Sequence, residues 1–271
     1  MKGCSIRGMR IGDGAPVRVM GVINCSPESF YQGSYTPAAD VFSRACHLVD
    51  AGADIIDLGA RSTAPGAPHI TRKDEIGRME EALSSLEGSG ILVSVDTMDP
   101  VVLETCLECD IAAINDISGL LDPVYASVVA ESGLPAFLMA SMRAVGDACT
   151  LEETHQACIM VETRAHAAGI HEYILDPAIG LWQSTRTPDL DLELCRNFSE
   201  FSLYQRPLLA AISRKTFLGT LIGKPPEGRL PASLAMTALL VIKGADVVRT
   251  HDVSETRDAV IIAEQVLRAI S

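Results

Sequence analysis

The stretch VRVMGVINCSPESF (residues 17–30) begins as an apolar, β-branched run and turns polar at Asn24. A nearly continuous apolar run of this length predicts a strand that is buried on both faces. The Cys, Ser, Pro and Glu that follow Asn24 predict a loop. The chain therefore places an asparagine at the carboxyl end of a buried strand, where its polar side chain needs a polar environment.

The same unit, a buried strand followed by a longer amphipathic run, recurs along the chain. Strands are predicted at residues 17–24, 54–59, 91–97, 111–118, 135–141, 173–180, 207–213 and 246–252. Helices are predicted at residues 38–52, 73–86, 100–108, 123–133, 151–169, 189–197, 230–244 and 254–270. Eight such units predict an α/β fold, a single (β/α)8 TIM barrel spanning residues 1–271. A doubly wound Rossmann sheet is the alternative, but the sequence has neither its GxGxxG turn nor a P-loop motif.

Composition narrows the classes of partner. The chain has 271 residues, of which 48% are hydrophobic, and this content is enough for one large core. Its net charge of -13 opposes nucleic-acid binding, so a nucleic-acid partner is not expected. The sequence has neither an N-terminal apolar segment nor a run of about eighteen apolar residues. We therefore expect neither a signal peptide nor a membrane partner. The cysteines are scattered, which favours a reduced, cytoplasmic protein.

One cysteine pair, CLEC (residues 106–109), has the spacing of a metal or redox motif. A zinc site needs further ligands, and no second CxxC or HxxxH occurs. A redox pair opens a helix, whereas this pair is predicted to close one. We therefore interpret Cys106 and Cys109 as structural.

The carboxyl ends of the strands are where a TIM barrel carries its functional side chains. The polar residues predicted at those ends are Asn24, Asp57, Asp96, Asn115, Asp116, Asp176, Ser213, Arg214, Lys215, Arg249, His251 and Asp252. Any one of them could be a helix N-cap, but a set within apolar runs must find partners inside the barrel mouth.

The chemistry of this set indicates a ligand. The Asp and Asn side chains offer acceptors and donors to a nitrogen-rich heterocycle. Lys215, Arg249 and His251 suit an anionic group such as a phosphate. The side-chain oxygen of Asn24 suits a hard ion such as Mg²⁺ held together with phosphate oxygens. The residues alone therefore predict an enzyme that binds a heterocycle carrying phosphate.

Several motifs also resemble the signature motifs of the dihydropteroate synthase family. They are VMGVINCSPESF, AGADIIDLGARSTAPGA, SVDT, INDISG, ILDPAIG, SRKTFLG, RLPASLA and ADVVRTHDV, in the family's order. The resemblance implies a pterin-binding barrel that joins 6-hydroxymethyl-7,8-dihydropterin diphosphate to p-aminobenzoate and releases diphosphate with the help of Mg²⁺. It also implies a homodimer.

Residue roles follow from matching these motifs. The resemblance implies that the pterin is held by Asp96, Asn115, Asp176, Lys215 and Arg249, with Asp176 on its guanidine-like edge. Lys215, Arg249 and His251 would be the catalytic residues. Asn24 would serve the metal and, with His251, the diphosphate. The arylamine would meet Phe30, Thr63 and Ser213, together with Arg61.

The sequence departs from the family in the loops that serve the arylamine. Where the family has E-S-T-R, this chain has Arg61, Ser62, Thr63 and Ala64. Gln32 stands where the family has an aspartate, and LWQ (181–183) stands where it often has F-G-K. The pterin half of the predicted site is thus intact and the arylamine half is altered.

Three interpretations of these departures remain open. Arg61 replaces the lost arginine and the reaction is the ordinary one. Alternatively, the acceptor is an arylamine carrying a ribose phosphate, as in methanopterin-type pathways, and Arg61 meets that phosphate. The third interpretation is a pterin-dependent methyltransferase or a non-catalytic pterin-binding protein. Retention of SRK and RTHD argues against the third, because those classes need no diphosphate ligands.

Overall fold

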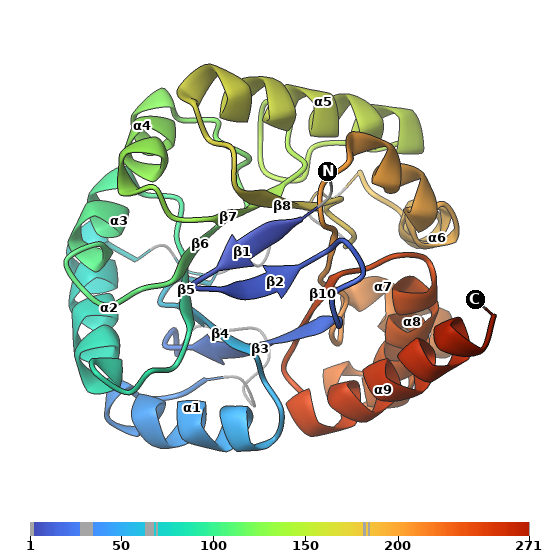
Figure 1. The fold of residues 1–271 in the computed structure, drawn as a ribbon, viewed down its shortest axis with the longest axis horizontal. Helices are drawn as coiled ribbons and strands as arrows, with labels where there is room; N and C mark the ends of the chain where they lie inside the picture. Colours follow the sequence, from blue (N-terminus) through green and yellow to red (C-terminus); the bar gives the residue numbers. More distant parts are fainter. Residues whose placement is uncertain are drawn as a thin grey trace.

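The predicted barrel is confirmed by the computed structural model, which describes residues 3–27, 35–62, 68, 70–180, 183 and 185–270. Within these ranges, eight parallel strands form one sheet in the order β8-β7-β6-β5-β4-β3-β10-β9. A parallel bridge between Leu175 and Leu208 joins the two outermost strands, and helices surround the sheet (Figure 1). The strands are β3 (Arg18–Asn24), β4 (Ile55–Gly59), β5 (Val93–Asp96), β6 (Ala113–Asp116), β7 (Ala136–Met139), β8 (Tyr173–Asp176), β9 (Leu209–Ala210) and β10 (Val247–Thr250).

The outer layer consists of the helices that follow the barrel strands along the chain. They are α1 (Val41–Asp50), α2 (Arg72–Leu86), α3 (Pro100–Cys106), α4 (Pro123–Ser132), α5 (Leu151–Ala168), α6 (Pro188–Arg196), α7 (Thr216–Ile222), α8 (Leu230–Ile242) and α9 (Val253–Ile270). Short 3-10 helices are η2 (Ala38–Asp40), η3 (Phe198–Tyr204) and η4 (Pro226–Gly228). Within the described ranges, no helix is both long and apolar enough to cross a membrane.

Local sequence explains where several helices begin. Thr71 and Asp74 form a reciprocal capping box at the start of α2. Asp99 and Asp122 accept backbone N–H bonds at the starts of α3 and α4, and each is followed by a proline that fits the first helical position. These caps fix the points at which the chain leaves the barrel mouth and turns down the outside.

A hairpin of β1 (Cys4–Ile6) and β2 (Met9–Ile11) lies across the middle of the barrel in the view of Figure 1. Cys4, Ile6 and Ile11 are buried against inward-facing residues near the amino ends of the strands, such as Met20 and Phe137. The hairpin therefore closes the amino-terminal end of the barrel. The sequence pattern did not predict it.

Some predicted boundaries were wrong for identifiable reasons. The predicted strand 173–180 ends at Asp176, because the Asp176 carboxylate accepts the N–H of Ala178 at 2.8 Å and Ala178 turns with φ +60°. The predicted strand 207–213 is only Leu209–Ala210, and helix α7 follows it unpredicted. The structural interpretation of the cysteine pair agrees with the fold, since α3 ends at Cys106 and both thiols are free.

Candidate active site

The barrel mouth gathers polar side chains at the carboxyl ends of its strands, as predicted. In the parallel register Asp57 of β4 lies beside Ser94 of β5, and Asp96 of β5 lies beside Asn115 of β6. Asp57 and Ser94 are fully buried, and Asn115 is almost so. Because alternate residues of a strand point to opposite faces, Ser94 and Asp96 face the same side. The site is therefore built in layers on rigid strands.

Arg249 lies at the centre of these layers. It donates from Nε to Asp57 Oδ2 at 2.6 Å and from Nη2 to Asp96 Oδ2 at 2.8 Å. Asn115 donates from Nδ2 to the same Asp57 oxygen at 3.0 Å. Burial opposes the charge of Arg249, but the carboxylates of Asp57 and Asp96 raise the pKa of the guanidinium above its ordinary value. One network thus fixes the orientation of Arg249 and of Asn115.

Asp96 has a shifted pKa. Burial raises the pKa of Asp96 to about 7, although the positive charge of Arg249 acts in the opposite direction. A carboxyl group poised near neutral pH can donate or accept a hydrogen bond, as a heterocycle with both ring nitrogens and exocyclic groups requires.

Two buried polar atoms near this network have no hydrogen-bond partner among the described residues. They are Asp57 Oδ1 and Ser94 Oγ. Asp57 was predicted at the rim without a role, and Ser94 was not predicted. A serine between two valines of a buried strand, two residues before Asp96, was the signal that could have identified it.

Lys215 and Asp176 form a second part of the site, contributed by the loop after β9 and by the end of β8. Lys215 donates from Nζ to the carbonyl oxygen of Ile179. Burial lowers the pKa of Lys215 to about 8, although the negative charge of Asp176 acts in the opposite direction. Burial likewise raises the pKa of Asp176 above its ordinary value, while Lys215 lowers it. The opposite charges of Lys215 and Asp176 therefore attract each other in a site largely removed from water.

The backbone around Lys215 depends on a glycine. Gly180 has φ +135°, a backbone conformation that residues with a side chain rarely adopt. A Cβ added there would lie 2.7 Å from Lys215 Nζ. Gly180 thus leaves the space that the lysine occupies.

Ser213 and His251 meet at the ends of two neighbouring strands. Ser213 Oγ lies 3.0 Å from His251 Nδ1 and also accepts the backbone N–H of His251 at 3.2 Å. Burial, reinforced by the positive charge of Arg249, lowers the pKa of His251 to about 4. His251 is therefore neutral at pH 7, so it can serve an anion only as a hydrogen-bond donor.

Three residues of the predicted rim set have structural partners instead. Arg214 pairs with both carboxylate oxygens of Asp252, at 2.8 and 2.7 Å, and donates to the carbonyl oxygens of Pro226 and Glu227. Asp116 accepts the backbone N–H groups of Ser118 and Leu120. These side chains hold the loops that carry the site.

Asn24 is the last residue of β3 and pairs in register with Gly59 of β4. Gly59 in turn pairs with Asp96 of β5. The Oδ1 of Asn24 accepts the N–H of Ser26 at 2.9 Å, which leaves the second lone pair of that oxygen for another partner. In the described ranges, no three His, Cys, Asp or Glu side chains are grouped to hold a metal ion. A single amide oxygen fits Mg²⁺, which takes most of its ligands from water and phosphate.

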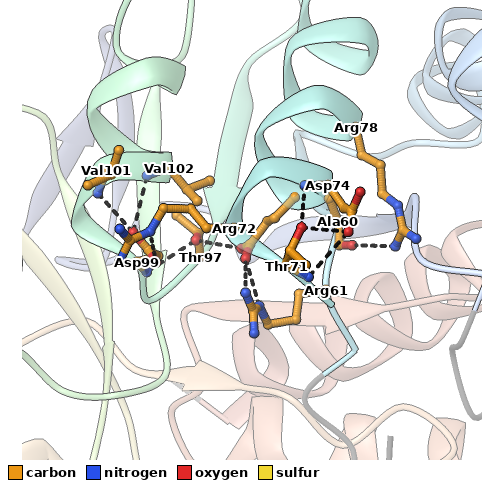
Figure 2. A network of polar contacts seen from close by, with 11 residues as sticks. Ala60, Arg61, Thr71, Arg72, Asp74, Arg78, Thr97, Asp99, Val101 and Val102 are labelled. Carbon is orange, nitrogen blue, oxygen red and sulfur yellow. Dashed lines mark hydrogen bonds and ion pairs between the residues drawn. The ribbon is translucent and has the colours of Figure 1, made fainter. Parts of the chain in front are cut away.

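The predicted arylamine residues are only partly described. Phe30 and Thr63 lie outside the described residues, as do Gln32, Ala64, Leu181 and Trp182. Arg61 is described and is labelled in Figure 2, and its guanidinium contacts the carboxylate of Glu75. Ser213 lies at the mouth with His251, as described above.

Comparison with known proteins agrees with this geometry. Residues 20–251 match the model of a family described as pterin binding enzyme. The chain is 32% identical over 259 residues to dihydropteroate synthase type-3 of Escherichia coli, covering 91% of this chain and 98% of that protein. It is also 32% identical over 265 residues to the dihydropteroate synthase of Escherichia coli strain K12, covering 93% and 92%. The chain belongs to the pterin-binding enzymes and, among them, to the dihydropteroate synthase family.

Solved structures of similar proteins share the fold over the whole chain. The Yersinia pestis dihydropteroate synthase, solved with a sulfonamide drug complex, superimposes with a TM-score of 0.88 at 28% identity, covering 98% of this chain and 99% of that one. The Coxiella burnetii enzyme in complex with pteroic acid gives a TM-score of 0.86 at 29% identity and covers 100% of both chains. The Xanthomonas albilineans enzyme with 4-aminobenzoic acid gives 0.87 at 29% identity, covering 98% of both.

Proposed function

We propose that this protein is a dihydropteroate synthase, a transferase that joins 6-hydroxymethyl-7,8-dihydropterin diphosphate to p-aminobenzoate through a new C–N bond. The observation that carries the proposal is the network in which Arg249 bridges Asp57 and Asp96 beside Asn115. Family membership supports it, as do the relatives solved with pteroic acid and with 4-aminobenzoic acid.

In this proposal the pterin lies over the polar layers of the mouth. The carboxylate of Asp176 meets the guanidine-like edge of the ring through two hydrogen bonds. Asn115 and Asp96 bind the remaining ring edge, and Lys215 donates to a ring acceptor. Arg249, held in place by its two carboxylates, presents the face of its guanidinium to the ring and its positive charge to the diphosphate.

The reaction needs stabilisation of the leaving group more than a strong base. The arylamine nitrogen attacks the pterin methylene carbon, the C–O bond to diphosphate breaks, and the diphosphate keeps the bonding electron pair. The nitrogen then loses a proton to solvent. Arg249 and the amino-terminal end of α9, which begins directly after Asp252, stabilise the departing negative charge. Neutral His251 donates a hydrogen bond to the same group.

Mg²⁺ completes this part of the proposal. Asn24 would be its protein ligand, and the metal, when bound, would neutralise charge on the leaving diphosphate. The open lone pair of Asn24 Oδ1 supports this role.

For the acceptor of the reaction, p-aminobenzoate is the proposal. An arylamine carrying a ribose phosphate is the alternative. The pairing of Arg61 with Glu75 favours the first, because a guanidinium already matched by a carboxylate has no excess charge for a phosphate dianion. A methyltransferase role needs no cationic diphosphate site, so the charge assigned to Arg249 argues against that class.

A homodimer in the cytoplasm is also proposed. Several apolar side chains of the neighbouring helices α8 and α9 are exposed, namely Leu239, Ile242, Ile261, Ile262 and Val266. Apolar surface of this kind favours a protein partner, and a second copy of the chain is the simplest one. The free thiols of the chain suit a reducing compartment.

The test is an assay of diphosphate release by the purified protein with Mg²⁺, the pterin diphosphate and each arylamine in turn. Release with p-aminobenzoate supports the proposal, and release only with the ribosyl phosphate compound supports the alternative acceptor. No release with either contradicts synthase activity, and a methyl-transfer assay with a corrinoid protein then tests the remaining class. The Asp176→Ala variant is the negative control.

A further inference from the structure

Arg61 is bound along one edge by a buried carboxylate. Its Nε and Nη2 both lie 2.6 Å from Glu75 Oε2 (Figure 2). The side chain of Glu75 is 1% exposed, whereas that of Arg61 is 23% exposed. A buried carboxylate without a counter-ion is strongly unfavourable, so the charge of Arg61 is needed where it is.

Glu75 uses its other oxygen to hold the end of the next strand. Its Oε1 accepts the hydroxyl hydrogen of Thr97 at 2.8 Å. Thr97 is 3% exposed and directly follows Asp96, the carboxylate that binds Arg249. The backbone of Thr97 is fixed as well, because its carbonyl oxygen accepts the hydroxyl of Tyr125 at 2.7 Å.

These contacts form a continuous path between two parts of the mouth. Arg61 lies two residues beyond the end of β4, Glu75 lies on α2, and Thr97 lies just beyond the end of β5. The hydroxyl of Thr97 also accepts the N–H of Asp99, the residue that caps α3. A shift of Glu75 would therefore be transmitted to the turn that directly follows Asp96.

We propose that Arg61 is a positioning residue that acts through Glu75 and Thr97 to hold Asp96, rather than a ligand of the arylamine. This inference rests on the proposed function, since it assigns Asp96 to the pterin. It revises the expectation that Arg61 takes over the arginine missing at Ala64. The two roles differ in which substrate is affected when Arg61 is changed.

The experiment compares Arg61→Gln, Glu75→Gln and the double variant with the wild type. Affinity for 6-hydroxymethylpterin is measured by calorimetry, and KM is measured for each substrate. Each single variant is expected to weaken pterin affinity about three- to tenfold. The loss of affinity in the double variant should be no larger than the loss in the weaker-binding single variant, because the residues act as a unit. The KM for p-aminobenzoate is expected to stay unchanged.

Two further variants serve as controls. Arg7→Gln makes the same charge change in the exposed pair with Asp110, in the hairpin at the closed end of the barrel, and is expected to leave pterin affinity unchanged. Arg61→Lys keeps the charge and is expected to restore part of the affinity. It also tests the inference should Glu75→Gln fail to fold.

The results that would contradict the role of Arg61 differ from those that would contradict the proposed function. A raised KM for p-aminobenzoate in Arg61→Gln, with pterin affinity intact and Glu75→Gln unaffected, would make Arg61 an arylamine ligand. Additive losses in the double variant would show that the two residues do not act together. Absence of turnover in the wild type contradicts the synthase proposal alone, since calorimetry with the pterin still tests the role of Arg61.

Discussion

Arg249 donates its Nε hydrogen to Asp57 Oδ2 over 2.6 Å, although 192 residues separate the two in the sequence. The pair links β10, the last strand of the barrel along the chain, to β4, and the same carboxylate oxygen also binds Asn115. Asp57 therefore orients two predicted pterin ligands without being one of the residues predicted to contact the pterin.

Asp57→Asn is expected to weaken pterin affinity about 10- to 100-fold, the range of a lost charge-assisted hydrogen bond. Stability should fall by about 1–3 kcal/mol, because Arg249 loses one of two carboxylates in a partly buried site. Calorimetry and chemical denaturation measure the two effects. Asp54→Asn is the matched control, since Asp54 pairs with Arg257 and Arg18 at the other end of β4. It should reduce stability and leave affinity unchanged, and an equal loss of affinity in both variants would argue against the role of Asp57.

Gly180→Ala is expected to abolish most pterin binding. The new methyl group would lie 2.7 Å from Lys215 Nζ, so the lysine must move from Asp176. Gly169→Ala is the control, because Gly169 has φ +78° but nothing within 4 Å of an added Cβ. Its backbone strain alone should cost about 1 kcal/mol of stability with affinity unchanged. Equal affinities for the two alanine variants, measured by calorimetry, would contradict the assigned position of Lys215.

Pterin affinity is expected to decrease as pH rises above about 8. Burial lowers the pKa of Lys215 to about 8, so the ammonium group loses its proton in that range and can no longer donate to the ring as a cation. Lys215→Arg should extend binding to higher pH, because a guanidinium stays protonated. Calorimetric titrations from pH 6 to about 10 check both statements. A wild-type curve that is flat above pH 8 would show that the lysine charge does not contribute.

The free energy of unfolding should depend on the ionisation of Asp96 in a defined direction. The folded-state pKa of Asp96 is raised from 3.8 to about 7. Its contribution to stability is therefore complete below pH 3.8 and is lost as pH rises toward 7. Asp96→Asn cannot ionise, so its stability relative to the wild type should increase across this window.

The comparison of variants is needed because His251 acts in the opposite sense. Its pKa is lowered from 6.5 to about 4, so its contribution to stability rises with pH between those values. The difference between wild type and Asp96→Asn removes the histidine from the measurement. Chemical denaturation at pH 4, 5.5 and about 7 gives the result, and a difference that falls with pH would contradict the raised pKa.

Removal of divalent metal by a chelator should stop turnover, and Mg²⁺ should restore it. Asn24→Ala should raise the Mg²⁺ concentration for half-maximal turnover about tenfold. Binding of 6-hydroxymethylpterin, which lacks diphosphate, should be the same with and without metal. An unchanged Mg²⁺ requirement in Asn24→Ala would remove Asn24 from the metal site.

Much of the site was predictable because strand geometry is regular. Asp96, Asn115 and Asp176 each sit within an apolar run, so the run located the strand and its end located the side chain. The order of eight units then implied that these ends meet at one rim.

Other features depend on contacts that no local pattern encodes. Arg61 and Glu75 are fourteen residues apart and meet only because α2 packs beside the end of β4. Arg214 looked like a candidate for an anion, yet its left-handed backbone and its pairing with Asp252 make it part of the loop. The hairpin β1–β2 was missed because each strand has only three residues, and its burial comes entirely from the barrel floor.

The closed amino-terminal end of the barrel has a consequence for how small molecules enter and leave the site. Ile6 and Ile11 cover the amino-terminal end and side chains fill the barrel interior, so small molecules reach the site from the carboxyl-terminal mouth. A molecule resting on the deep layer of Asp57 and Asn115 must arrive before one that sits nearer the rim, and after condensation the joined product must leave by the same route. The depth of each position in the mouth, rather than any passage through the barrel, therefore predicts the order in which molecules arrive and leave.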